Sequence, residues 1–181
     1  KNPYALVYIQ PSADGLLHSR YCFLSFLEMI VKKKEYKLHK NFEIVIPNWI
    51  VQDILNYNPV KSKFLNVTKK YYDLILIKTT DNIKELYNSE DNKKSKRKSK
   101  RKSKSNKKLV IRGDILPQPR EKFIGLIKGS VKDILLTGDE SLVDSLNCCS
   151  QKTIWYQIAP WKKNLADSLS NETGNPNYKT F

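Results

Sequence analysis

The sequence has few cysteines and histidines, which excludes the common disulfide and zinc frameworks. Its three cysteines include an adjacent pair, Cys148 and Cys149, no Cys-x-x-Cys spacing occurs, and the only histidines are His18 and His39. An odd cysteine count with an adjacent pair is a poor disulfide framework, and this set offers no usual zinc-ligand spacing. We therefore expect a reduced, cytoplasmic protein without a metal site, with its cysteines in or near the core.

Long hydrophobic runs are also missing. No stretch approaches the roughly 20 apolar residues of a membrane-spanning helix. The first apolar run, Tyr4–Ile9, is too short for a signal peptide, and the chain begins at Lys1 rather than Met. We therefore expect no transmembrane segment, and we interpret the start at Lys1 as indicating a piece of a longer protein or an edited sequence.

Familiar enzyme motifs are absent too. The first apolar run is not followed by Gly-x-Gly-x-x-Gly, and neither Gly-x-Ser-x-Gly nor Asp-x-Asp occurs. These absences count against a dinucleotide-dependent enzyme and against an α/β-hydrolase.

Positive charge is abundant but concentrated in one tract. Lys93–Lys108 holds 11 Lys/Arg and no acid, and the rest of the chain has 22 basic and 18 acidic residues. Most of the net charge of +15 therefore belongs to this tract and not to the fold.

The basic tract has two interpretations. It could be a nuclear-import signal or a nucleic-acid-binding arm. The alternative, which we favour, is a disordered, solvated insertion at about residues 88–108, because the tract has no aromatic residue for base stacking and no hydrophobic residue for folding. The insertion interpretation predicts that deleting Lys93–Lys108 leaves folding intact.

Strand-like and helix-like segments alternate along the chain. The expected strands are Tyr4–Ile9, Phe42–Ile46, Phe64–Val67, Tyr72–Ile77, Leu109–Arg112, Asp133–Thr137 and Thr153–Ile158. The expected helices are Arg20–Lys33, Trp49–Tyr57 (capped by Asn48 and ended by Asn58-Pro59), Asp81–Tyr87, Arg120–Lys128, Glu140–Leu146 and Trp161–Leu169. Because the strands are continuous apolar runs, we predict an α/β fold: a Rossmann-like parallel sheet flanked by helices over residues 1–170, followed by a loose tail at 171–181.

Ligands of such sheets bind beyond the carboxyl ends of the strands. That rule indicates four loops: Gln10–Arg20, Pro47–Asn48, Gly113–Pro119 and Gly138–Ser141.

The turn at Gly138–Ser141 is the strongest candidate site. Gly138 permits a sharp backbone turn, and the N–H groups at the start of the next helix suit an anion. Asp139 and Glu140 are negative, so they would accept hydrogen bonds from sugar hydroxyls while Ser141 and backbone N–H groups face a phosphate. The alternative is that these side chains only cap the helix.

A second group of candidates follows the last expected strand. Lys162 or Lys163 could meet a diphosphate, or could simply begin a solvated helix. Trp155, Tyr156 and Trp161 are aromatic residues of the kind that usually pack in a core.

Three short motifs occur in an order typical of one enzyme family. They are Pro117-Gln118, Gly138-Asp139-Glu140-Ser141 and Tyr156-Gln157-Ile158-Ala159-Pro160, with Asn164 beyond them. This order resembles the C-terminal, donor-binding half of GT-B glycosyltransferases, with protein-arginine rhamnosyltransferases the most similar. The resemblance covers mainly Leu109–Leu169, and Asp144 stands where many GT-B enzymes have glutamate.

The resemblance implies a site for a nucleoside diphosphate sugar. In that family the acids and serine contact the ribose and diphosphate, and a glutamine lies near the base. Helix N-termini and lysines would hold the leaving diphosphate without a metal or other cofactor. The implied donor-binding residues are Gln118, Gly138, Asp139, Glu140, Ser141, Tyr156, Lys162, Asn164 and, at the start of the first helix, Arg20.

A GT-B enzyme also needs an N-terminal half, which supplies the acceptor site and usually the catalytic base. The resemblance therefore implies a partner half or subunit, as for the small subunit of the heterodimeric N-acetylglucosaminyltransferase, and no activity from this half alone. The alternative function is a non-catalytic interaction module whose basic tract binds nucleic acid or acidic partners.

Overall fold

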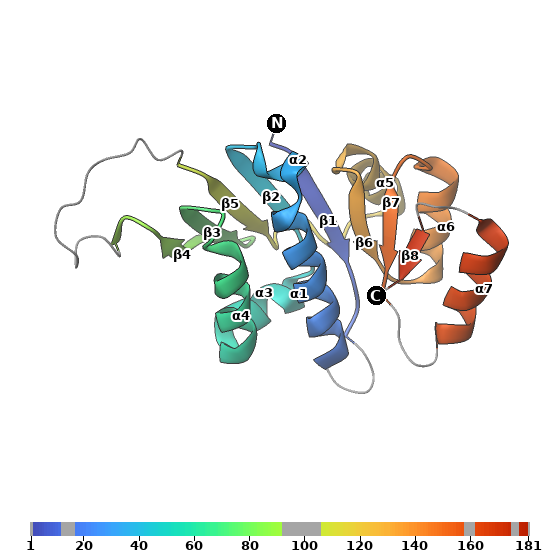
Figure 1. The fold of residues 1–181 in the computed structure, drawn as a ribbon, viewed down its shortest axis with the longest axis horizontal. Helices are drawn as coiled ribbons and strands as arrows, with labels where there is room; N and C mark the ends of the chain where they lie inside the picture. The colour runs from blue at the N-terminus through green and yellow to red at the C-terminus, as the bar shows by residue number, and fades with distance from the viewer. Residues whose placement is uncertain (1, 12–16, 92–105, 158–161, 175–177, 181) are drawn as a thin grey trace. The chain divides into compact units, whose positions relative to one another are not determined.

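The computed structural model describes residues 2–11, 17–91, 106–157, 162–174 and 178–180. The chain divides into two compact units. Unit 1 comprises Lys1–Pro3 and Leu27–Leu116, and unit 2 comprises Tyr4–Phe26 and Pro117–Phe181. Both units contain mostly parallel strands flanked by helices, so the predicted Rossmann-like α/β class is confirmed (Figure 1).

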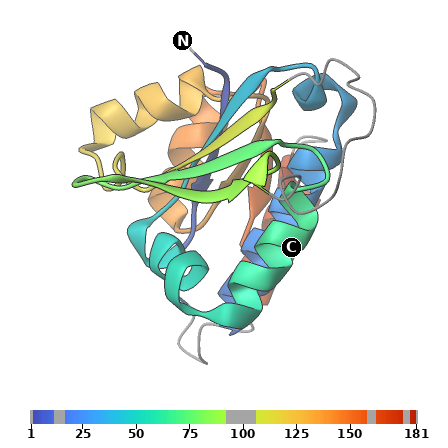
Figure 2. The same ribbon diagram turned by 90° about the vertical axis from the view of Figure 1, so that its left-hand side faces the viewer.

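Unit 1 has the strand order β4-β3-β5-β2. Its strands are β2 (Asn41–Val45), β3 (Leu74–Lys78), β4 (Ile83–Asn88) and β5 (Lys108–Arg112). The helices of this unit are α2 (Lys34–Lys37), α3 (Asn48–Asn56), α4 (Asn58–Thr68) and the second part of α1 (Leu17–Lys32). Parallel pairing joins β3 to β5 and β5 to β2, whereas β4 runs antiparallel beside β3. Figure 2 shows the β3–β4 hairpin in green. Helices α3 and α4, which contact each other, lie below it.

Unit 2 has four parallel strands in the order β1-β6-β7-β8. They are β1 (Tyr4–Tyr8), β6 (Asp133–Leu136), β7 (Thr153–Tyr156) and β8 (Tyr178–Thr180). The helices are α5 (Arg120–Gly129), α6 (Asp139–Cys148), α7 (Lys163–Thr173) and the first part of α1. All four residues of β6 are buried, as expected for a central strand covered on both faces.

The register of unit 2 aligns the carboxyl ends of three strands. Tyr8 pairs with Leu136, and Leu136 pairs with Tyr156. The segments that follow β1, β6 and β7 therefore leave the sheet at the same edge, which is where ligands of parallel sheets bind.

Two predicted elements are wrong. Asp81–Tyr87 is not a helix: Thr79 donates a backbone hydrogen bond to the Asn82 carbonyl at 2.9 Å, and this turn folds β4 back onto β3. Phe64–Val67 is not a strand but lies in α4, where the Phe64 side chain is fully buried. Hydrophobic periodicity does not distinguish a helix from a strand in segments this short. Their conformation depends on the surface they pack against.

The boundaries around α3 and α4 also differ from the prediction. Asn48 is not a cap but the first residue of α3, and Pro47 precedes it without a capping side-chain bond. Asn58-Pro59 follows the end of α3 as expected, yet it also begins α4. Proline is accepted in the first turn of a helix because the N–H group that it lacks would have no intrahelical partner there.

Regular structure extends into both ends of the predicted insertion. It also extends into the predicted tail. Asn88 ends β4 and Lys108 begins β5, while residues 92–105 lie outside the described residues. Lys108 pairs with Asn41 and Leu74, so a deletion that reaches Lys108 would remove a residue of the sheet. In the region expected to be loose, α7 continues to Thr173 and β8 pairs with β7. Within the described ranges, no helix is long and apolar enough to cross a membrane.

Candidate functional site

A pocket of about 380 Å³ lies in unit 2 at the carboxyl ends of β1 and β6. It is lined by Tyr8 and Gln10 after β1, by Pro117, Gln118, Arg120 and Phe123 around the start of α5, and by residues 137–141 and Asp144 around the start of α6. Five of the predicted donor-binding residues therefore meet in one hollow: Gln118, Gly138, Asp139, Glu140 and Ser141.

The turn from β6 into α6 depends on a glycine. Gly138 has φ 87° and ψ 142°, a conformation that other residues rarely adopt. Ser141 is buried, and its hydroxyl lies 2.5 Å from the Thr137 carbonyl and 2.9 Å from the Gly138 carbonyl, to which it can donate. Gly138 is the N-cap residue of α6 and has no side chain to cap it, and the Ser141 hydroxyl bonds to carbonyl oxygens rather than to N–H groups of the helix start.

The two acids of the turn are exposed and line the pocket. Asp139 Oδ1 accepts a hydrogen bond from the Tyr156 hydroxyl at 3.4 Å. Lys162 Nζ donates to the same hydroxyl at 3.1 Å, and it lies 5.4 Å from the centroid of the Tyr156 ring. Tyr156 is fully buried, and neither Tyr156 nor Lys162 is among the described residues that line the pocket.

An arginine that the sequence analysis missed sits at the rim of this pocket. Arg120 begins α5 and binds the buried carboxylate of Asp144 through two donors, Nε at 3.0 Å and Nη2 at 2.6 Å. The hydrogen bond from Arg120 lowers the pKa of Asp144 below its usual value. The sequence did contain a signal for Arg120, because it is a basic residue at the start of a predicted helix, directly after Pro117-Gln118-Pro119.

Two aromatic rings form an apolar part of the same pocket. The Tyr8 and Phe123 ring centroids are 4.7 Å apart, with the rings tilted by 57°. Tyr8 ends β1 and Phe123 lies in the first turn of α5. The sequence placed both residues on regular elements, but it could not show that the two elements present them to one pocket.

The remaining predicted residues lie elsewhere. Arg20 is half-buried in the first turn of α1, and Asn164 is exposed near the start of α7, and neither lines the pocket. Trp161 falls outside the described residues. Among the described residues, no group of three or more His, Cys, Asp or Glu side chains could hold a metal ion.

Gln157 is a buried residue whose side chain bonds to Gln10, one of the residues that line the pocket. Its side-chain oxygen accepts from the Gln10 N–H at 3.1 Å, and its Nε2 donates to the Gln10 carbonyl at 3.0 Å and to the Ser19 hydroxyl at 2.9 Å. Gln157 therefore ties the end of β7 to the segment after β1 and to α1.

Replacing Arg120 by glutamine should make stability less dependent on acid pH. Because Arg120 lowers the pKa of Asp144, the pair stabilises the fold above the usual carboxyl pKa of about 3.9 and loses that contribution as the pH falls through the lowered value. Thermal unfolding at pH 7 and at pH 3 should therefore show a smaller acid-side loss in Arg120→Gln than in wild type. Lys122→Gln, an exposed neighbour, is the matched control. Parallel pH profiles for Arg120→Gln and wild type would contradict the coupling.

No family model matches the chain, and comparisons with curated proteins and with solved structures found no match.

Proposed function

We propose that the unit 2 pocket binds the nucleoside diphosphate sugar of a glycosyltransferase, and that this chain is the donor-binding half of a GT-B enzyme. The observation that carries the proposal is the composition of one pocket: an aromatic pair, two exposed carboxylates and the start of α6 meet at the carboxyl edge of a parallel sheet. Each of these parts suits a different portion of a nucleotide sugar.

The aromatic pair suits the base. The pocket volume of about 380 Å³ falls within the range of small-molecule sites. The rings of Tyr8 and Phe123 offer an apolar surface for a flat heterocycle, and every nucleobase has a face that can pack on such a surface. Gln118 adds an amide that can donate to and accept from a base edge.

The carboxylates suit hydroxyl groups rather than phosphates. Ionised Asp139 and Glu140 are hydrogen-bond acceptors only, so they pair with the hydroxyl donors of ribose or of the transferred sugar. The diphosphate would instead meet the uncapped N–H groups of α6, together with Lys162 and Arg120. This division of roles explains why two acidic side chains can lie beside a site that also binds a negatively charged diphosphate.

The chemistry assigned to these residues is positioning and charge stabilisation. Lys162, held by Tyr156, and the N-terminus of α6 would stabilise the negative charge that develops on the leaving diphosphate. The acceptor and the base that activates it would come from an N-terminal half or a partner subunit. A cytoplasmic location is part of this proposal, in keeping with the free cysteines Cys22, Cys148 and Cys149.

Calorimetric titration of the full chain with UDP-, dTDP- and GDP-sugars tests the proposal. We expect one of the three nucleotides to bind, and the matching nucleoside diphosphate to compete with it, because most contacts are to the nucleotide. Inorganic diphosphate alone should bind far more weakly. Folded protein that binds none of the three, alone or with its partner half, would refute the proposal.

A further inference from the structure

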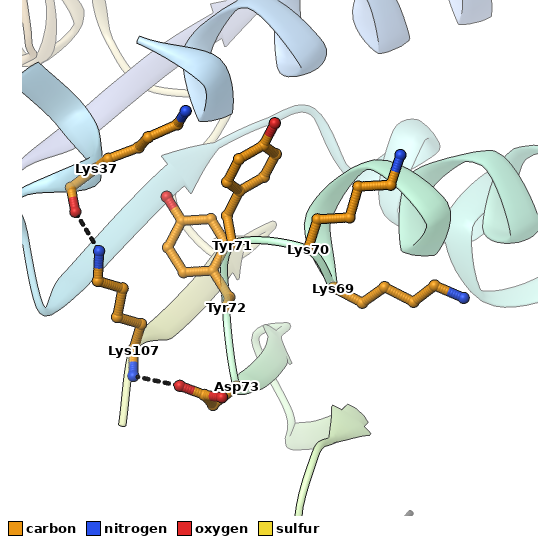
Figure 3. A pocket seen from close by; sticks show the side chains of 7 residues that line it. All are labelled: Lys37, Lys69, Lys70, Tyr71, Tyr72, Asp73 and Lys107. Carbon is orange, nitrogen blue, oxygen red and sulfur yellow. Dashed lines mark hydrogen bonds between the residues drawn. The ribbon is translucent and has the colours of Figure 1, made fainter. Parts of the chain in front are cut away.

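A second pocket, of about 320 Å³, lies wholly within unit 1 at the amino ends of β3 and β5. It is lined by Lys37, Lys69, Lys70, Tyr71, Tyr72, Asp73 and Lys107. In Figure 3 the two tyrosine rings stand between Lys37 and Lys107 on one side and Lys69 and Lys70 on the other. Three separate segments therefore bring four lysines to one hollow.

Positive charge dominates this pocket. Its described lining residues include four lysines and one acid, Asp73. The Asp73 carboxylate accepts hydrogen bonds from the Lys107 backbone N–H at 3.2 Å and from the Ser89 hydroxyl at 3.3 Å. Within the part of the chain that the structure describes, none of the four ammonium groups is within ion-pair distance of a carboxylate. The charge of the lysines is thus available to a ligand.

The lysines are held in place by contacts that leave this charge intact. Lys107 Nζ donates to the Lys37 carbonyl, and Lys37 Nζ lies 4.6 Å from the centroid of the Tyr71 ring. Lys37 ends α2 and Lys69 follows the last residue of α4, where a cation favourably meets the helix dipole. These structural roles account for Lys37, Lys69 and Lys107, but they do not account for Lys70 or for the convergence of all four lysines.

We propose that this lysine pocket binds the phosphodiester backbone of nucleic acid without reading its sequence. Lysine is a point-charge phosphate ligand, and the described residues that line the pocket include no arginine, asparagine or glutamine of the kind that reads base edges. Phosphate contacts position a nucleic acid without specifying its sequence. This inference is independent of the sugar-nucleotide proposal, which concerns unit 2.

The sequence next to the pocket favours a long, regularly charged polymer. Lys107 belongs to the tract Lys93–Lys108, and residues 93–105 alone carry nine Lys/Arg and no acid. Duplex DNA carries about one charge per 1.7 Å, a density that an acidic peptide rarely sustains. A membrane surface fits less well, since the tract has no apolar residue to insert.

Fluorescence anisotropy with a labelled single-stranded RNA, measured on the full chain over a KCl series, tests the proposal. The variant Lys69→Ala/Lys70→Ala removes two exposed lysines of the pocket. Binding should weaken, and the slope of log K against log salt should flatten by about 1.4, since each phosphate contact with a single strand contributes about 0.7. Duplex DNA in a parallel arm should show a change of about 1.8, from about 0.9 per contact.

Two controls distinguish binding at the pocket from binding by positive charge elsewhere in the chain. Lys128→Ala/Lys132→Ala removes two exposed lysines from unit 2 and should leave the slope unchanged. Replacing residues 93–105 with a Gly-Ser linker of equal length should leave weaker binding that Lys69→Ala/Lys70→Ala still reduces. Equal effects of the two lysine pairs would overturn the proposal. So would complete loss of binding when the tract alone is replaced in folded protein, or equally tight binding of polyglutamate.

Discussion

Replacing Gly138 by alanine should lower the free energy of unfolding by about 1–3 kcal/mol, the usual cost of forcing a side chain into such a backbone conformation. Gly138 has φ 87°, and among the described atoms an added Cβ would have one neighbour within 4 Å, the Ser141 Oγ at 3.9 Å. The cost therefore comes from backbone strain and not from a clash. Relief of that strain would turn the start of α6, so nucleotide-sugar affinity should fall together with stability.

Gly125→Ala is the matched control because it makes the same chemical change with the opposite expected sign. Gly125 lies inside α5 with a negative φ, and a Cβ added there would meet no atom of the described residues within 4 Å. Alanine in a helix interior is favoured over glycine by about 0.5–1 kcal/mol. Urea unfolding of the two variants should thus show one destabilised and one stabilised protein. A Gly138→Ala variant as stable as wild type would contradict the account of this turn.

Gln157→Ala should cost about 2–4 kcal/mol, from the loss of three hydrogen bonds at roughly 1 kcal/mol each and a small added cavity. The Gln157 side chain is buried and holds Gln10 by both backbone groups and Ser19 by its hydroxyl. Because Gln10 lines the unit 2 pocket, the variant should also weaken ligand binding there.

Gln151→Ala is the control for this second change. Gln151 is exposed in the turn before β7, so its truncation should alter stability by less than about 0.5 kcal/mol. Chemical denaturation of both variants provides the comparison. Similar stabilities for Gln157→Ala and Gln151→Ala would show that the buried amide contributes little to the link between β7 and β1.

The strongly apolar segments were predictable, and the short mixed ones were not. Runs such as Asp133–Thr137 and Leu109–Arg112 are strands because a buried parallel strand needs apolar residues on both faces. Ile83–Asn88 is exposed or half-exposed throughout, so its conformation is set by pairing with β3 and not by its own periodicity.

The candidate site was predictable where it follows a strand, and not where it needs contacts between distant elements. Gly138, Asp139 and Glu140 lie in the turn after β6, as the strand–turn–helix pattern indicated. The Arg120–Asp144 pair and the Tyr8–Phe123 pair depend on how α5 packs beside α6 and β1. The lysine pocket likewise joins residues from three parts of unit 1, and only Lys107 belongs to the tract that composition made conspicuous.

The most direct test of the central claim compares two double variants by calorimetric titration with the nucleotide sugar that wild type binds. Asp139→Ala/Glu140→Ala removes the two acids of the pocket, and Asp167→Ala/Glu172→Ala removes two exposed acids of α7 in the same unit. With both variants confirmed as folded by thermal unfolding, the account predicts loss of binding in the first and wild-type affinity in the second. Unchanged affinity in the first variant would contradict the assignment of the unit 2 pocket as the donor site.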